Sequence, residues 1–207
     1  MVHPIYKRTV LPLINLLVKK VEGMENIPDP PAILAANHSS YYDPFFIIKP
    51  VLKQKNHKVH FLANRGQMLK VFGKTISTKW AGCIILDDPK EAYNALLAQL
   101  KKRKFIAIFP EGGFPKDPSK QDGKVRTKGK SGAIRLSLET QAPIVPIAIK
   151  GAYDVAPQRK IIPKFKKQVR IKFGKPYVIK TDKVTKEFLK EKTTELLDKI
   201  RKLHDSI

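Results

Sequence analysis

Short apolar runs alternate along the chain with longer segments whose apolar residues recur every three or four positions. Runs of about four to eight apolar residues are typical of buried strands, and the wider spacing is typical of helices with one face in the core. The predicted strands are Ala32–Ala36, Val59–Ala63, Gly82–Leu86, Phe105–Phe109, Ile144–Ile149 and Val169–Phe173. The predicted helices are Pro44–Leu52, one capped by Asp88 and begun by Pro89, Ser131–Gln141, and a last one capped by Asp182. This alternation predicts a single α/β domain with a mostly parallel central sheet flanked by helices.

The N-terminal segment carries an apolar run, Val10–Val18, with two basic residues on each side. Pro12 and Asn15 interrupt the run, which is far shorter than the roughly 18 apolar residues that a membrane-crossing helix needs. An apolar helix with basic ends is typical of an interfacial anchor. We therefore predict an amphipathic membrane-contact helix over residues 1–20 and the main domain over 21–207. A helix that only packs on the core is the alternative.

The net charge of the chain indicates what kind of partner it binds. Lys and Arg number 41 against 18 Asp and Glu, which gives a net charge of +23. Nine of the basic residues, and no acidic one, lie between Asp154 and Asp182. Such a balance indicates an anionic partner, whether nucleic acid, an anionic membrane or a phosphorylated ligand. The one cysteine, Cys83, lies in an apolar run and is predicted to be buried rather than nucleophilic.

Candidate chemistry begins where the first predicted strand ends, at Asn37-His38. Asp43 lies five residues after the histidine and opens the next helix, so a turn can bring its carboxylate to one imidazole nitrogen. The carboxylate would fix the tautomer and stabilise the imidazolium, which leaves the other nitrogen to take a proton. This is a base with its orienting group but without a serine or cysteine nucleophile, so a substrate hydroxyl would attack directly. A structural histidine beside an N-cap aspartate is the alternative.

A second polar group follows the predicted strand that ends at Phe109, in the run Pro110-Glu111-Gly112-Gly113. A glutamate at a strand end of an α/β fold lies where ligands usually bind. The two glycines allow the backbone to approach a substrate closely. Their amides are candidate donors to the oxyanion of an acyl-transfer intermediate.

In this order the two segments resemble the glycerolipid acyltransferase family, the 1-acylglycerol-3-phosphate acyltransferases and their relatives. That family is marked by Asn-His-x-Ser-x-x-Asp after one strand and Phe-Pro-Glu-Gly after a later one. The matching residues are Asn37-His38-Ser39-Ser40-Tyr41-Tyr42-Asp43 and Phe109-Pro110-Glu111-Gly112. Lys128–Ala133 and Pro143–Ile149 resemble later parts of the family pattern, and the likeness covers residues 21 to 180.

The resemblance implies that residues 21–207 form an acyltransferase domain. It implies transfer of a fatty acyl group from acyl-CoA or acyl carrier protein to the hydroxyl of a lysophospholipid, in phospholipid biosynthesis. The expected acceptor is 1-acyl-sn-glycerol-3-phosphate. His38 is then the general base, Asp43 orients it, and Glu111 positions the acceptor. No metal, other cofactor or nucleic acid is expected, and the expected location is peripheral, at the cytoplasmic face of an anionic membrane.

Two arginines of the family pattern are missing, and both are thought to hold the acceptor's phosphate. Asp87 and Asp88 follow the apolar strand where the family usually has one, and Phe114 stands where the usual Glu-Gly-Thr-Arg has the other. The acceptor's head group is therefore open. The cations that could replace the two arginines are Arg65, Lys116, Lys124, Arg126 and Lys130.

Among these cations, Lys130 and Arg126 beside the start of the predicted Ser131 helix are the expected phosphate site, because helix N-terminal amides bind anions. Two alternatives stay open. One is an acyltransferase with a non-glycerophosphate acceptor, such as an ornithine-lipid precursor, which the missing arginines favour. The other is a basic nucleic-acid-binding protein without a catalytic role.

Overall fold

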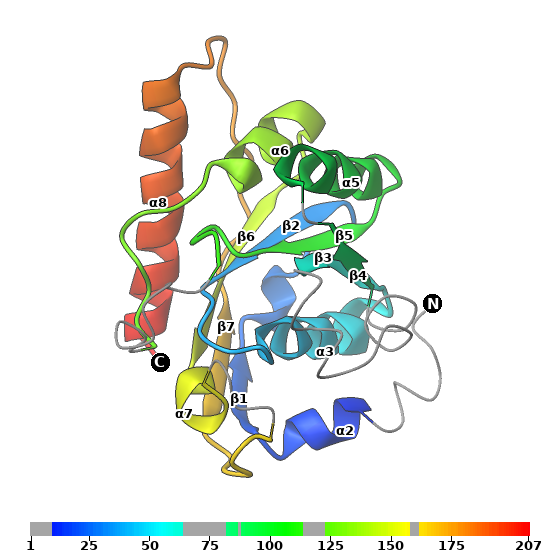
Figure 1. Cartoon of the computed structure of the whole chain (residues 1–207), viewed down its shortest axis with the longest axis vertical. Coiled ribbons are helices and arrows are strands. Elements are labelled where there is room, and N and C mark those ends of the chain that lie inside the picture. The colour runs from blue at the N-terminus through cyan, green and yellow to red at the C-terminus, as the bar shows by residue number, and fades with distance from the viewer. Residues whose placement is uncertain (1–9, 64–81, 87, 114–122, 158–161) are drawn as a thin grey trace.

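A seven-stranded sheet forms the centre of the computed structural model, which describes residues 10–63, 82–86, 88–113, 123–157 and 162–207 (Figure 1). The strand order is β1-β7-β6-β2-β5-β3-β4, and only β6 and β7 pair in the antiparallel sense. The strands are β1 (Val18–Glu22), β2 (Ala32–Ala36), β3 (Val59–Ala63), β4 (Cys83–Ile85), β5 (Phe105–Ile108), β6 (Ile144–Lys150) and β7 (Val169–Phe173). The predicted α/β fold with a mostly parallel sheet is confirmed.

Helices cover both faces of the sheet (Figure 1). They are α2 (Val10–Asn15), the short 3-10 helix η1 (Met24–Asn26), α3 (Asp43–Lys55), α5 (Pro89–Lys101), α6 (Gly132–Thr140), α7 (Ala152–Val155) and α8 (Lys186–Asp205). Successive β2 side chains point to opposite faces. Leu34 belongs to a core shared with α2, α3 and α7, whereas Ile33 belongs to a core shared with α5, α6 and α8. The wholly buried, apolar β2 is thus the middle of two cores.

Of the two predicted helix caps, one is confirmed and one is wrong. The Asp88 side chain accepts a hydrogen bond from the Glu91 amide at 2.8 Å and caps α5, as predicted. The predicted cap of the last helix at Asp182 is wrong. Thr185 caps α8 by accepting from the Phe188 amide at 3.1 Å, because the Thr181 hydroxyl bonds the backbone of Lys183 and turns the chain before the helix begins.

The N-terminal helix ends earlier than predicted. Helix α2 ends at Asn15, and Val18–Glu22 forms β1, which pairs with β7 along the edge of the sheet. Val18–Glu22 forms a strand because the backbone of β7 supplies its hydrogen-bond partners. The apolar pattern of residues 10–20 contains no information on a strand about 150 residues away. Residues 1–9 lie outside the described part of the chain. No described helix combines the length and the apolar character needed to cross a membrane.

The strand directions decide what meets at each edge of the sheet. Strands β2, β5 and β6 are mutually parallel and end at one edge, which we call the carboxyl edge. Strand β7 runs against β6, and β1 runs with β7, so both of these strands begin at that edge. The segments after β2, β5 and β6 therefore lie at the same edge as those before β1 and β7. In α/β sheets this edge is where ligands usually bind.

Candidate active site

The turn after β2 is fastened to β6 by the side chain of Asn37. Its Nδ2 donates to the Ile149 carbonyl at 2.8 Å, and its Oδ1 accepts from the Ile149 amide at 2.8 Å. The residue is 1% exposed, so both bonds are shielded from water. Asn37 thus continues the β2–β6 ladder beyond the strand and fixes the position of the next residue, His38.

His38 and Asp43 form the predicted pair. The distance between His38 Nδ1 and Asp43 Oδ2 is 2.9 Å, and the aspartate side chain is fully buried while that of the histidine is 14% exposed. The same Oδ2 accepts from the backbone amides of Ser39 at 2.6 Å and Ser40 at 2.8 Å. Asp43 is also the first residue of α3, where the helix dipole favours a negative charge. Because Nδ1 is committed to Asp43, proton transfer with a substrate falls to Nε2.

Phe109, immediately after β5, holds the plane of the imidazole. The rings of His38 and Phe109 stack with centroids 4.0 Å apart and an interplanar angle of 15°. This contact joins the two sequence motifs, which come from neighbouring parallel strands. The imidazole is therefore fixed by an aspartate at its edge and by an aromatic ring on its face.

Glu111 is buried beside this histidine and pairs with Arg126. The distance from Arg126 Nε to Glu111 Oε2 is 2.9 Å. Burial raises the pKa of Glu111. The hydrogen bond and the charge of Arg126, with a smaller contribution from His38, oppose that rise. Glu111 Oε1 and Arg126 Nη2 are buried and have no hydrogen-bond partner among the described residues. The Arg126 side chain as a whole is 32% exposed, so the pair presents positive charge to a ligand.

The two glycines after Glu111 differ in what they can do. Gly112 and Gly113 have φ values of 76° and 108°, which favour glycine. The Gly112 amide already donates to the Phe109 carbonyl at 3.0 Å. The expectation that both amides serve an oxyanion is therefore wrong for Gly112, because its donor is used in the turn. Gly113 keeps that candidate role.

Lys130, which the sequence places beside the start of α6, lies against this turn. Its backbone amide donates to the Pro110 carbonyl at 2.7 Å. A Cβ on Gly112 would come within 2.9 Å of Lys130 Cγ, so the lysine stem runs over the glycine. Arg126 and Lys130 are therefore both brought to Glu111. Arg65, like Asp87, Phe114 and Lys116, lies outside the described residues.

The sequence did not predict two contacts that support this site. One is the pair of hydrogen bonds from the Asn37 side chain to the backbone of Ile149, which is 112 residues away in the sequence. The other is made by Arg201 of α8, whose Nη2 lies 3.4 Å from the Arg126 carbonyl oxygen. Nothing in the sequence around Arg201 marks it, because its approach depends on how α8 packs across the sheet.

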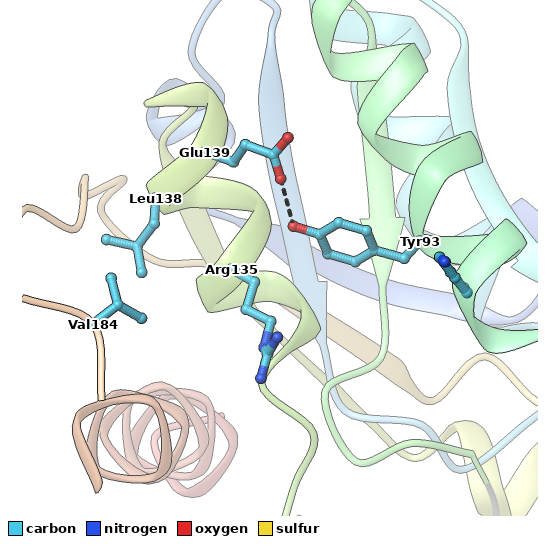
Figure 2. Close-up of a pocket in the computed structure, with 6 residues that line it drawn as sticks. Tyr93, Arg135, Leu138, Glu139 and Val184 are labelled. Atoms are coloured by element: carbon cyan, nitrogen blue, oxygen red, sulfur yellow. Dashed lines mark hydrogen bonds between the residues drawn. The ribbon is translucent and has the colours of Figure 1, made fainter. Parts of the chain in front are cut away.

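An open groove of about 630 Å³ lies elsewhere, between α5 and α6 (Figure 2). Its lining residues are Lys90, Tyr93, Arg135, Leu138, Glu139 and Val184. The Tyr93 hydroxyl donates to Glu139 Oε2 at 2.9 Å, and burial together with this carboxylate raises the pKa of the phenol to about 12. The hydroxyl is thus held protonated, and the groove contains neither His38 nor Glu111.

Cys83 is no competitor as a nucleophile. It is 5% exposed in β4, and burial raises the pKa of its thiol to about 12. Since the thiolate is the reactive form, both the burial and the raised pKa argue against a nucleophilic role. The prediction of a buried cysteine is confirmed.

Residues 19–150 match the family model for Acyltransferase. A 1-acyl-sn-glycerol-3-phosphate acyltransferase from Pseudomonas aeruginosa is 31% identical over 139 residues, which are 62% of this chain and 48% of that protein. A probable 1-acyl-sn-glycerol-3-phosphate acyltransferase from Mycoplasma genitalium is 30% identical over 132 residues, 61% of this chain and 46% of that protein. The chain spans about half the length of these curated relatives.

A solved structure shares the fold. The crystal structure of the 1-acyl-sn-glycerophosphate (LPA) acyltransferase PlsC from Thermotoga maritima superposes with a TM-score of 0.69 at 25% identity. The superposition covers 97% of this chain and 75% of the other. These likenesses confirm the resemblance recognised in the two motifs. The chain belongs to the acyltransferase family.

Proposed function

We propose that this chain is an O-acyltransferase that moves a fatty acyl group from an acyl thioester to the hydroxyl of 1-acyl-sn-glycerol-3-phosphate. The observation that carries the proposal is the His38–Asp43 pair, 2.9 Å apart, beside the buried Glu111–Arg126 pair. The first pair suits proton abstraction, and the second suits recognition of an anionic group. The names of the two relatives and of the solved structure support the same acceptor.

In the proposed mechanism, His38 Nε2 takes the proton from the acceptor hydroxyl as its oxygen attacks the thioester carbonyl. The negative charge of Asp43 stabilises the imidazolium that forms. The tetrahedral intermediate carries an oxyanion, for which the Gly113 amide is the candidate donor. When the intermediate collapses, the carbon–sulfur bond breaks and the leaving thiolate receives the proton from His38. The products are the diacyl lipid and a free thiol.

Arg126 takes the place of the missing family arginines in this proposal. Glu111 fixes the guanidinium through Nε, and the Arg126 side chain is still 32% exposed, so its positive charge is available to the acceptor's phosphate. Lys130 and the start of α6 add positive potential on the same side of the turn. Glu111 therefore acts as a positioning residue, working through Arg126. This arrangement favours a phosphorylated acceptor over the ornithine-lipid alternative.

The donor, the location and the partners are part of the proposal. Acyl-CoA and acyl carrier protein both carry phosphate, which a chain with a net charge of +23 attracts. We place the protein peripherally on the cytoplasmic face of an anionic membrane. Leu13 of α2 and Leu16, just after this helix, support the expected N-terminal contact, since both side chains are exposed. No metal or other cofactor takes part in the proposed reaction, and no nucleic acid partner is proposed.

The test is an acceptor panel. Purified protein is incubated with radiolabelled acyl-CoA, or with labelled acyl carrier protein, and with lysophosphatidate, lysophosphatidylcholine, monoacylglycerol or an ornithine-lipid precursor. The expected result is labelled phosphatidate in preference to every other product. A better yield from an uncharged acceptor would reject the phosphate site, and a folded protein that labels none of them would reject the activity.

A further inference from the structure

Four large apolar side chains are exposed at one end of the molecule, and they come from two distant segments. Leu13 of α2 and Leu16, in the turn between α2 and β1, are 55% and 52% exposed, and Ile162 and Phe165, between α7 and β7, are 78% and 64% exposed. The two segments meet in space, because the Leu17 carbonyl accepts from the amides of Gln168 at 3.0 Å and Val169 at 2.9 Å. Figure 1 shows both at the lower end of the view. We call these four residues the apolar patch.

The connection that carries Ile162 and Phe165 is held by hydrogen bonds along its length. The Lys164 amide donates to the Val155 carbonyl at 2.8 Å, which ties the connection to α7. The Lys166 amide donates to the Lys164 carbonyl at 2.7 Å and makes a tight turn around Phe165. At its far end Gln168 bonds to Leu17. These hydrogen bonds hold the backbone in a conformation that exposes Ile162 and Phe165 to solvent.

Positive charge surrounds the patch. Lys164, Lys166 and Lys167 are exposed beside Phe165, and Lys19 and Lys20 are exposed at the start of β1. Lys20 pairs with Glu22 at 3.0 Å, so the remaining four lysines dominate the local charge. Apolar side chains within a basic rim suit a bilayer that contains anionic lipid. A nucleic acid would use the lysines but would leave the leucines and the isoleucine without a role.

The patch lies at the carboxyl edge of the sheet, where the site is. Strands β1 and β7 begin at this edge, so Leu16 and Phe165 precede strands that run away from it. His38 follows the end of β2 at the same edge, and Asn37 bonds to Ile149 of β6, whose chain continues into α7. A surface that lies on this end of the protein would therefore also face the catalytic edge.

We propose that Ile162 and Phe165 form a second membrane-contact element, which acts with α2 to dock the carboxyl edge on anionic phospholipid. The use of this docking in catalysis rests on the proposed function: an acceptor with one acyl chain could then reach His38 without leaving the leaflet. The docking itself does not depend on the acceptor. The occupant is a lipid surface, and binding of nucleic acid is an outcome of the test.

The experiment is flotation of the full chain with vesicles of phosphatidylcholine, with and without phosphatidylglycerol. Ile162→Ser/Phe165→Ser should lower the partition coefficient onto anionic vesicles by at least about tenfold, because two inserted side chains are lost. The matched control is Val178→Ser/Val184→Ser, which removes side chains 41% and 56% exposed outside the patch and should change nothing. Circular dichroism and Tm check that both double variants are folded.

Depth is measured directly with Phe165→Trp in a chain whose one tryptophan, Trp80, is replaced by phenylalanine. Brominated lipid should quench its fluorescence. Equal flotation of both double variants, no quenching, or retention by duplex DNA but not by vesicles would each overturn the inference.

A short-chain, water-soluble lysophosphatidate separates docking from chemistry. The Ile162/Phe165 variant should keep its rate on this acceptor and lose rate only on acceptor embedded in vesicles. An equal loss on both would overturn the inference. A wild-type chain that floats yet transfers nothing to either acceptor would instead reject the proposed function and leave the docking intact.

Discussion

Replacing Asp43 by asparagine separates the charge of this residue from its shape. Three groups converge on Asp43 Oδ2: His38 Nδ1 and the amides of Ser39 and Ser40. The two amides can only donate, so an asparagine must place its oxygen there and turn its NH₂ away. The sequence alone suggests that Asp43→Asn misorients the imidazole. The structure predicts that the orientation and tautomer survive and that only the negative charge is lost.

The size of the effect follows from that charge. An imidazolium and a carboxylate whose charge centres lie about 4 Å apart attract by about 4 kcal/mol at an effective dielectric constant near 20. The neutral amide keeps a weaker hydrogen bond, so a loss of about 3 to 4 kcal/mol of transition-state stabilisation is expected. At about 1.4 kcal/mol per decade, kcat/KM should fall by roughly 10²- to 10³-fold.

The assay is the continuous release of thiol from acyl-CoA, with Tm measured in parallel. Asp43→Ala leaves two buried amides without an acceptor, each at a cost of about 1 to 3 kcal/mol, so it should melt well below Asp43→Asn. A folded Asp43→Asn enzyme within threefold of the wild-type rate would refute the role of the charge. Equal Tm values for the alanine and asparagine variants would refute the hydrogen-bonding argument.

The cations and the buried acid give further tests. Lys130→Ala and Arg126→Gln should each raise the KM for lysophosphatidate about 10- to 100-fold, more than they lower turnover, and leave the KM for monoacylglycerol unchanged; unchanged constants would place the phosphate elsewhere. Burial raises the pKa of Glu111 above its ordinary 4.5, so the folded state binds more protons and loses stability as pH rises from 4.5 through the folded value. The Tm of Glu111→Gln minus that of wild type should therefore increase over this pH range. A Tm difference that does not change with pH would contradict the raised pKa of Glu111. Cys83→Ala should keep full activity, and a dead, folded variant would reveal a covalent step.

What the sequence predicts well is what neighbouring residues decide. The His38–Asp43 pair is separated by five positions and closes within one turn. The ends of β2, β3 and β7 follow from uninterrupted apolar or alternating runs and agree with the structure. The Asp88 cap is equally local, because the carboxylate bonds an amide three residues on.

What the sequence misses depends on contacts between distant segments. Val18–Glu22 is a strand because β7 offers a free edge, and Arg201 reaches the site because α8 packs across the sheet. The position of β1 also decides how membrane contact can be tested. Ile14 and Leu17 are 3% and 1% exposed, so deleting residues 1–20 would strip core and sheet as well as the membrane contact. Substitution of exposed side chains is therefore the sound test of docking.

The central claim is direct transfer from the thioester to the acceptor hydroxyl, with His38 as the base. Single-turnover transfer of a labelled acyl group to lysophosphatidate by wild type and His38→Ala tests it most directly. The claim predicts a folded variant slowed by about 10²- to 10⁴-fold, and no label bound to either protein. A variant within threefold of wild type, or label held covalently on the protein before transfer, would contradict it.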